Sequence, residues 1–125
     1  MSMIDFKNGS FVKLKKVDNS IADGVTKLYI SGEETIGCYK GIRDYVVFTN
    51  KRIISVNVQG MTGTKKDFTS MPYSKIQVFS VETSGVFDLD CELEVYFSGA
   101  GKVKFEFTGS CDIERIGQLI ASYTL

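Results

Sequence analysis

The chain has 125 residues, of which 43% are apolar and 24% are charged, and its 15 basic side chains balance 15 acidic ones. This length suits one domain with its own core, and this composition excludes an intrinsically disordered chain. No apolar run approaches the roughly 20 residues that a membrane-spanning helix needs, and the N-terminus lacks the features of a secretory signal, so we expect a cytoplasmic protein.

Apolar residues in the N-terminal part of the chain recur at spacings of three and four, as they do on one face of a helix. A short polar group that begins at Asp18 interrupts this pattern. We therefore predict two short helices, over residues 10–16 and 19–29, with Asp18 or Asn19 as the N-cap of the second.

After Glu33 the period of the apolar residues changes to two, which is typical of strands. Short polar or glycine-containing turns separate the runs at even spacings, as in a barrel or sandwich. The predicted strands are residues 34–40, 43–49, 52–58, 65–71, 76–83, 91–98 and 102–108. The sequence thus predicts a mainly β domain over residues 33–125, with residues 1–32 as a helical N-terminal extension packed on it.

The hairpin of the last two strands admits two registers. A three-residue loop sets Glu94 opposite Glu106, whereas a five-residue loop sets Glu94 opposite Lys104. Opposite charges attract across neighbouring strands, so charge favours the second register, but the spacing of the residues leaves both open.

A final amphipathic helix follows this hairpin, with Ser110 or Asp112 as its N-cap. The residues of its apolar face are Ile113, Ile116, Leu119, Ile120 and Tyr123.

Seven antiparallel strands followed by one amphipathic helix is the element order of the pleckstrin-homology (PH) fold, a partly open barrel that the helix closes at one end. Several short segments of the chain also resemble the bacterial PH family of small stand-alone proteins. These segments are residues 39–44 (YKGIRD), 48–54 (FTNKRII), 59–63 (QGMTG), 79–83 (FSVET), 87–90 (FDLD) and 92–93 (EL).

The resemblance implies a binding or assembly module rather than an enzyme, with no cofactor. Members of this family resemble one another in forming cyclic homo-oligomers, fivefold in single-domain forms, that present a polar surface to protein partners. Residues 1–66 hold 11 basic and 6 acidic side chains, whereas residues 67–125 hold 4 and 9. This division of charge is compatible with head-to-tail contact between copies, although on charge alone chance and local pairing between strands of one copy are the favoured explanation.

We expect exposed polar residues near the turns to form subunit or partner contacts. These candidates are Arg43, Asp44, Asn50, Lys51, Arg52, Glu82, Asp88 and Asp90.

Peripheral binding to anionic membrane lipid is the alternative function. Basic residues such as Lys40 and Arg43 flank the first predicted strand turn, and such residues attract anionic membranes. However, the loop of lipid-binding eukaryotic relatives is long and basic, whereas the loop here is little more than Gly41-Ile42. The chain as a whole has no basic excess, which argues against nucleic acid as the partner.

The sequence offers little for catalysis or metal binding. It has no histidine, and its three cysteines are far apart, so we expect reduced, buried thiols and no zinc site. Carboxylates occupy every second position from Asp88 to Glu94, which a calcium ion could use, but a solvated acidic strand or a subunit contact explains them better.

Overall fold

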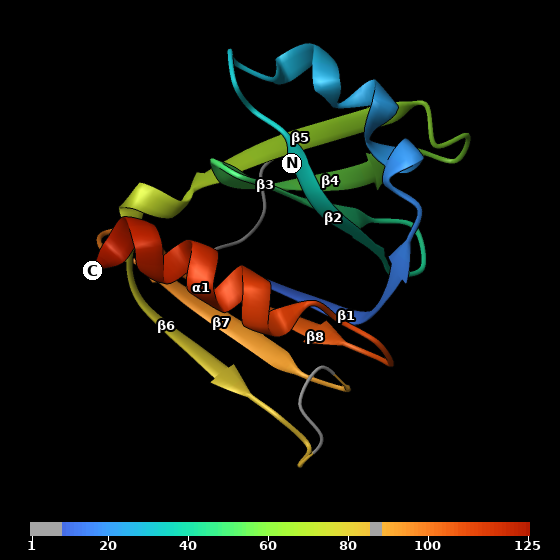
Figure 1. The fold of residues 1–125 in the computed structure, drawn as a ribbon. Helices are drawn as coiled ribbons and strands as arrows, with labels where there is room; N and C mark the ends of the chain where they lie inside the picture. Colours follow the sequence, from blue (N-terminus) through green and yellow to red (C-terminus); the bar gives the residue numbers. More distant parts are fainter. Residues whose placement is uncertain (1–8, 86–88) are drawn as a thin grey trace.

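A computed structural model describes residues 9–85 and 89–125 (Figure 1). The strands are β1 (Gly9–Val17), β2 (Thr35–Lys40), β3 (Tyr45–Thr49), β4 (Arg52–Gln59), β5 (Lys65–Pro72), β6 (Ile76–Glu82), β7 (Glu92–Phe97) and β8 (Gly101–Phe107). The helices are the short 3-10 turns η1 (Asn19–Gly24), η2 (Thr26–Leu28) and η3 (Tyr73–Lys75), and the α-helix α1 (Ile113–Thr124).

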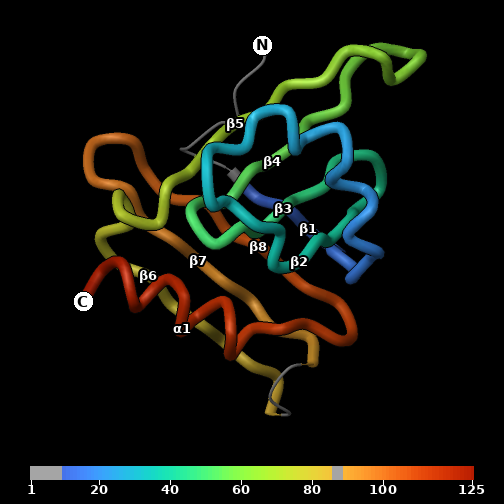
Figure 2. The backbone as a smooth tube through the Cα atoms, turned by 45° about the horizontal axis from the view of Figure 1, so that its top comes forward, coloured from blue at the N-terminus to red at the C-terminus, as the bar shows by residue number. Residues whose placement is uncertain are grey.

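The strands form one curled sheet in the order β5-β4-β3-β2-β1-β8-β7-β6. Its two halves face each other as layers (Figure 1), of which β2–β5 are here called the first layer and β1, β8, β7 and β6 the second layer. The helix α1 lies across the opening between them (Figures 1 and 2). The predicted mainly β, PH-like barrel with a C-terminal helix is therefore confirmed. Two details differ, because the described residues contain eight strands rather than seven, and β1 pairs with β8 in parallel rather than antiparallel.

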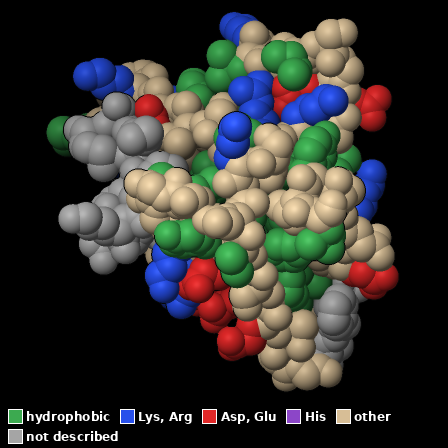
Figure 3. Space-filling view, turned by 90° about the vertical axis from the view of Figure 1, so that its left-hand side faces the viewer, with side chains coloured by type: hydrophobic (Ala, Val, Ile, Leu, Met, Phe, Trp, Pro, Cys, Tyr) green, Lys and Arg blue, Asp and Glu red, His purple; other side chains and the backbone are tan. Residues whose placement is uncertain are grey.

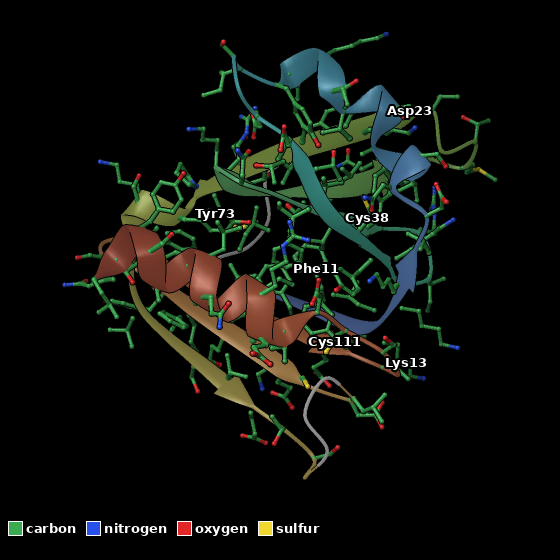
Figure 4. The ribbon with its side chains drawn as sticks, in the orientation of Figure 1. Phe11, Lys13, Asp23, Cys38, Tyr73 and Cys111 are labelled. Atoms are coloured by element: carbon green, nitrogen blue, oxygen red, sulfur yellow. The ribbon has the colours of Figure 1, made fainter. Side chains whose placement is uncertain are left out.

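The extra strand is β1, and the predicted helix over residues 10–16 is wrong. Phe11 and Leu14 are both buried, although residues three apart in a regular strand face opposite sides. The register with β8 shifts between them, and Lys13 has a left-handed backbone, with φ of 53°. This irregularity returns Leu14 to the core side while Lys13 lies at the outside of the molecule (Figure 4). An irregular strand therefore produced a helix-like spacing.

Replacing Lys13 by glycine tests whether residues 10–16 form a strand or a helix, because the change in the free energy of unfolding should differ in sign between the two. Glycine adopts positive φ without strain, so we expect Lys13→Gly to leave the free energy of unfolding unchanged or raise it by up to about 1 kcal/mol. In a helix interior the same change would cost about 1 kcal/mol. Urea unfolding measures the difference, and Lys15→Gly in the same strand is the matched control, expected to destabilise.

Residues 18–30 are here called the N-terminal cover. The helix predicted over residues 19–29 is present as the two short 3-10 turns η1 and η2. Asp18 is the N-cap, and its carboxylate accepts a hydrogen bond of 2.8 Å from the Ser20 N–H. Ala22 and Val25 are buried against the outer face of the first layer. The cover therefore lies on top of the strands (Figure 1).

The part of the chain that the structure describes has two hydrophobic cores, one on each face of the first layer. The main core lies between the two layers and α1, and the rings of Tyr39, Phe48 and Phe107 meet there edge-on or tilted. The second core lies under the N-terminal cover. All five residues of β3 are buried because both of its faces are covered.

The hairpin of β7 and β8 takes the register that charge favours, with Glu94 opposite Lys104. Two diagonal ion pairs support it, Lys102–Glu94 at 3.8 Å and Lys104–Glu92 at 3.7 Å. At the start of α1, Asp112 holds the N-cap position, but its side chain makes no capping hydrogen bond.

Candidate functional site

The predicted contact residues fall in three separate places rather than in one site. Arg43 and Asp44 lie in the β2–β3 loop, and Asn50, Lys51 and Arg52 lie at the β3–β4 turn. Glu82 ends β6, and Asp90 precedes β7. Asp88 lies outside the described residues.

At the β3–β4 turn, Arg52 is part of a structural clamp. Its guanidinium forms two hydrogen bonds with the Glu33 carboxylate, of 2.9 and 3.0 Å, and the side chains are 18% and 0% exposed respectively. It also donates to the Leu28 carbonyl oxygen and to the Ser70 hydroxyl. These bonds join the N-terminal cover to β4 and β5. They engage most of the hydrogen-bond donors of the Arg52 guanidinium, which are therefore not available to a partner.

The clamp also controls the ionisation of Glu33. Burial opposes its charge, but hydrogen bonds from Arg52, from the Thr49 hydroxyl and from the Ile30 N–H outweigh burial and hold the pKa below its ordinary value.

A group whose pKa is lowered by folding stabilises the protein above its unfolded pKa and loses that contribution as pH falls through its folded pKa. We therefore expect the natural chain to lose stability below about pH 4.3, where an unfolded glutamate takes up its proton, more steeply than Glu33→Gln does. Unfolding in urea between pH 7 and pH 2.5 tests this. Parallel pH curves for the two proteins would contradict it.

Asn50 holds the same turn to its surroundings. Its side chain accepts a hydrogen bond of 2.8 Å from the Glu34 N–H and donates one of 3.0 Å to the Gly32 carbonyl oxygen. Its own carbonyl oxygen accepts a bond of 2.8 Å from the Tyr123 hydroxyl at the end of α1. Asn50 is therefore a structural residue that links a loop, a turn and the final helix.

Asp44 and Arg43 fasten the β2–β3 loop to the end of β4. The Asp44 carboxylate accepts hydrogen bonds from the Val58 N–H at 2.8 Å and from the Asn57 amide at 3.3 Å. The Arg43 guanidinium donates to the Gly60 carbonyl oxygen at 2.6 Å. These bonds fix where the exposed part of Arg43 points.

Beside this loop lies a basic hollow of about 500 Å³, whose wall includes Lys40, Arg43 and Lys66. Ile42 and Met61 also line it and are almost fully exposed. The hollow combines cations with apolar tips, so it suits an anionic group beside an apolar surface. The sequence alone did not predict this hollow, because nothing local showed that the β4–β5 turn meets the β2–β3 loop.

An acidic surface lies on the outer face of the second layer. Glu82 is opposite Glu92, and Glu92 is opposite Glu106, so three carboxylates stand in one row across β6, β7 and β8. Like charges in such positions repel one another. Of the three carboxylates, only that of Glu92 forms an ion pair with Lys104, with 3.7 Å between Nζ and Oε1. Figure 3 shows acidic side chains beside basic ones on the lower part of the face that it presents. Unlike Glu82, Asp90 is structural, since its carboxylate accepts a bond of 2.6 Å from the Gly109 N–H.

Burial opposes the ionisation of two of the three thiols, Cys38 and Cys111. Cys38, Cys91 and Cys111 are free and buried, as expected. Burial raises the pKa of Cys38 to about 11, and burial together with the neighbouring Cys91 raises that of Cys111 to about 12. Both of these thiols are protonated at neutral pH.

Residues 9–85 and 89–125 hold no group of three or more potential metal ligands. None of their helices is long and apolar enough to span a membrane.

The sequence model of the family described as bacterial PH domain matches residues 5–124. Two uncharacterized proteins of Bacillus subtilis strain 168 are similar to the chain. YjqA is 46% identical over 81 residues, which are 65% of this chain and 65% of YjqA. YozO is 29% identical over 96 residues, which are 77% of this chain and 82% of YozO. The match therefore spans slightly less than two thirds of YjqA.

Solved structures give the same result. A DUF1696 family protein with a pleckstrin-homology domain from Shewanella loihica PV-4 is 35% identical, with a TM-score of 0.73, over 91% of this chain and 99% of that one. A pleckstrin homology domain from Shewanella amazonensis SB2B is 34% identical, with a TM-score of 0.59, over 100% of this chain and 92% of that one.

Proposed function

This chain belongs to the bacterial PH domain family, and on that basis we propose that it is a non-catalytic module that assembles with copies of itself into a ring and binds a protein partner. The family resemblance favours five copies. The geometry that best supports assembly is the pair of unpaired sheet edges at the two ends of the strand order.

These edges belong to β5 and β6. Within residues 9–85 and 89–125, each pairs with one neighbour only, β5 with β4 and β6 with β7. An edge strand presents N–H and C=O groups that a second chain can bind. The two edges differ in charge, because β5 begins with Lys65 and Lys66 whereas β6 ends with Glu82.

Contact between two different surfaces repeats head to tail and closes into a ring when the rotation permits. Complementary edges are therefore the arrangement that a cyclic homo-oligomer needs. Asp44, Asn50 and Arg52 are engaged in hydrogen bonds within the chain, so the proposed contacts shift from these residues to Glu82 and the two β5 lysines.

Light scattering coupled to size-exclusion chromatography tests the assembly. We expect a particle of about 70 kDa, five times the 13.9 kDa of one chain. A single 13.9 kDa species at high micromolar concentration, at both low and high salt, would exclude self-assembly.

The basic hollow supports a second candidate function, peripheral binding to anionic membranes. The supporting observation is that Ile42 and Met61 project beside three basic side chains. We expect the chain to sediment with phosphatidylserine-containing vesicles at about 0.15 M salt, where long-range attraction between exposed charges is screened.

The variant Ile42→Glu should abolish this sedimentation, whereas Lys102→Glu, on the opposite layer, should preserve it. Equal sedimentation with neutral and acidic vesicles, or none with either, would exclude this function.

A further inference from the structure

We infer that Cys91 and Cys111 form a reversible disulfide when a peroxide oxidises the chain, and that this bond fastens the start of α1 to the start of β7. The inference goes beyond the proposed function, since both thiols belong to one copy. Cys91 directly precedes β7, and Cys111 lies two residues before α1. Figure 4 labels Cys111 at this end of the helix.

Backbone hydrogen bonds hold the segments of the two cysteines side by side. The Cys91 carbonyl oxygen accepts a bond of 2.8 Å from the Phe107 N–H. Next to it, the Asp90 N–H donates to the Gly109 carbonyl oxygen at 3.1 Å, and the Asp90 carboxylate accepts a bond of 2.6 Å from the Gly109 N–H. Cys111 follows Gly109 by two residues, so the fold brings it beside the segment that carries Cys91.

The two thiols meet inside the main core. Both side chains are buried there. The Cys111 thiol lies within hydrogen-bonding range of the Cys91 thiol and of the Cys91 N–H. The Cys91 thiol also donates to the Leu89 carbonyl oxygen at 3.5 Å. Burial together with the neighbouring thiol raises the pKa of Cys111 to about 12, so weak oxidants react slowly with this thiol at neutral pH.

Cys38 is excluded from such a bond by its place in the fold. It belongs to the second core, under the N-terminal cover, whereas Cys91 and Cys111 belong to the main core on the other face of the first layer. Figure 4 labels Cys38 on β2. The chain has three cysteines, so only one disulfide within a copy is compatible with this fold.

A covalent link adds most at the start of α1, because this end of the helix lacks a side-chain cap. Asp112 holds the N-cap position without a capping bond from its side chain. Its N–H donates to the Tyr39 hydroxyl at 2.9 Å, which connects the start of α1 to β2. The far end of the helix is joined to the β3–β4 turn by the bond from the Tyr123 hydroxyl to the Asn50 carbonyl oxygen. A disulfide at Cys111 would therefore fix the uncapped end of the helix that covers the main core.

The oxidation balances with hydrogen peroxide as the oxidant. One thiolate attacks the O–O bond and becomes a sulfenic acid, while the hydroxide that leaves takes up a proton to give water. The other thiol then attacks the sulfenic sulfur, so the S–S bond forms and a second water leaves. Two thiols are thereby oxidised to one disulfide, and one peroxide is reduced to two waters. Dithiothreitol returns two electrons and two protons and restores both thiols.

Peptide mapping of the natural chain after treatment with hydrogen peroxide tests the link. Trypsin releases Cys91 in residues 76–102, Cys111 in residues 105–115 and Cys38 in residues 28–40, and none of these peptides contains methionine. Methionine oxidation by peroxide therefore leaves their masses unchanged. After free thiols are blocked with iodoacetamide, we expect mass spectrometry to show residues 76–102 linked to residues 105–115 in most chains. Dithiothreitol should abolish this species, and residues 28–40 should stay unlinked.

The melting temperature of the oxidised chain tests whether the bond fastens the helix. We expect it to be about 5–15 °C higher before dithiothreitol than after, because the disulfide closes a loop of about 20 residues in the unfolded chain. Dithiothreitol leaves methionine sulfoxide in place, so the comparison isolates the disulfide. Cys38→Ala is the matched control and should show the same shift, whereas Cys111→Ala should show none.

The outcomes separate the pair of thiols from the effect of the bond. Residues 76–102 and 105–115 that remain unlinked after peroxide would overturn the inference. A link that includes residues 28–40, or one found only in disulfide-bonded dimers on a non-reducing gel, would overturn the assigned pair. The expected link without a rise in melting temperature would overturn the fastening of α1. The peptide map uses the natural chain, so it decides the pairing even if Cys111→Ala does not fold.

Discussion

Replacing Arg52 by alanine should lower the free energy of unfolding by about 3–5 kcal/mol, because it leaves the fully buried carboxylate of Glu33 without its cation. The same change removes hydrogen bonds to the Leu28 carbonyl oxygen and the Ser70 hydroxyl, so the N-terminal cover loses its fastening to β4 and β5. For a domain of this size the loss corresponds to a melting temperature roughly 10–20 °C lower. Thermal and urea unfolding followed by circular dichroism measure it.

Two further variants show whether the buried charge is the cause. Lys51→Ala changes the neighbouring residue of the same turn and should cost less than about 1 kcal/mol. The double variant Glu33→Gln/Arg52→Met removes both charges and should recover much of the loss, since replacing a buried ion pair is often nearly neutral. If Arg52→Ala and Lys51→Ala were equally stable, Arg52 would be a surface residue, as the sequence predicted.

Phe48→Ala should have an effect of similar size, about 3–5 kcal/mol, through a different mechanism. Phe48 is fully buried in the main core, and its ring contacts Tyr39 at a centroid distance of 5.8 Å and Phe105 at 6.0 Å. The smaller side chain leaves a cavity between the two layers that rigid strands cannot close. Urea unfolding should show a lower midpoint.

Phe68→Ala is the matched control, because it removes the same atoms from a partly exposed position on β5. Its cost should be less than half that of Phe48→Ala, when measured at a protein concentration where the chain is monomeric. Equal losses of unfolding free energy for the two variants would mean that β3 is no more buried than an edge strand. That result would contradict the cover that the N-terminal cover and the second layer provide on the two faces of β3.

The β-strands from β2 onward could be predicted because their signals are local. Alternating apolar residues in β7 and β8 place Leu93, Val95, Val103 and Phe105 in the core, as the period of two requires. Turn residues separate these strands. The final helix could be predicted because its apolar residues recur at helical spacing. The hairpin register was left open between two alternatives, and the structure takes the one that charge favoured, with Glu94 opposite Lys104.

The candidate site was harder to predict, because exposure of a charged residue depends on distant parts of the chain. Arg52 resembled a surface residue at a turn. In the structure it donates a hydrogen bond to the buried carboxylate of Glu33, which lies 19 positions earlier in the chain. Asp44 likewise binds the Val58 N–H of another strand. Lys66 belongs to the predicted strand 65–71, and only the fold places it on the wall of the basic hollow.

The sequence by itself determined the mainly β class, the family, the final helix and the burial of the cysteines, since each depends on the order and period of nearby residues. Only the tertiary structure decided that residues 10–16 form a strand, that the N-terminal cover shields the first layer, and that β5 and β6 lie at the two ends of the strand order within the described residues. The physical reason is that one spacing of apolar residues fits both a helix and an irregular strand. Pairing with β8, far away in the sequence, chooses between them.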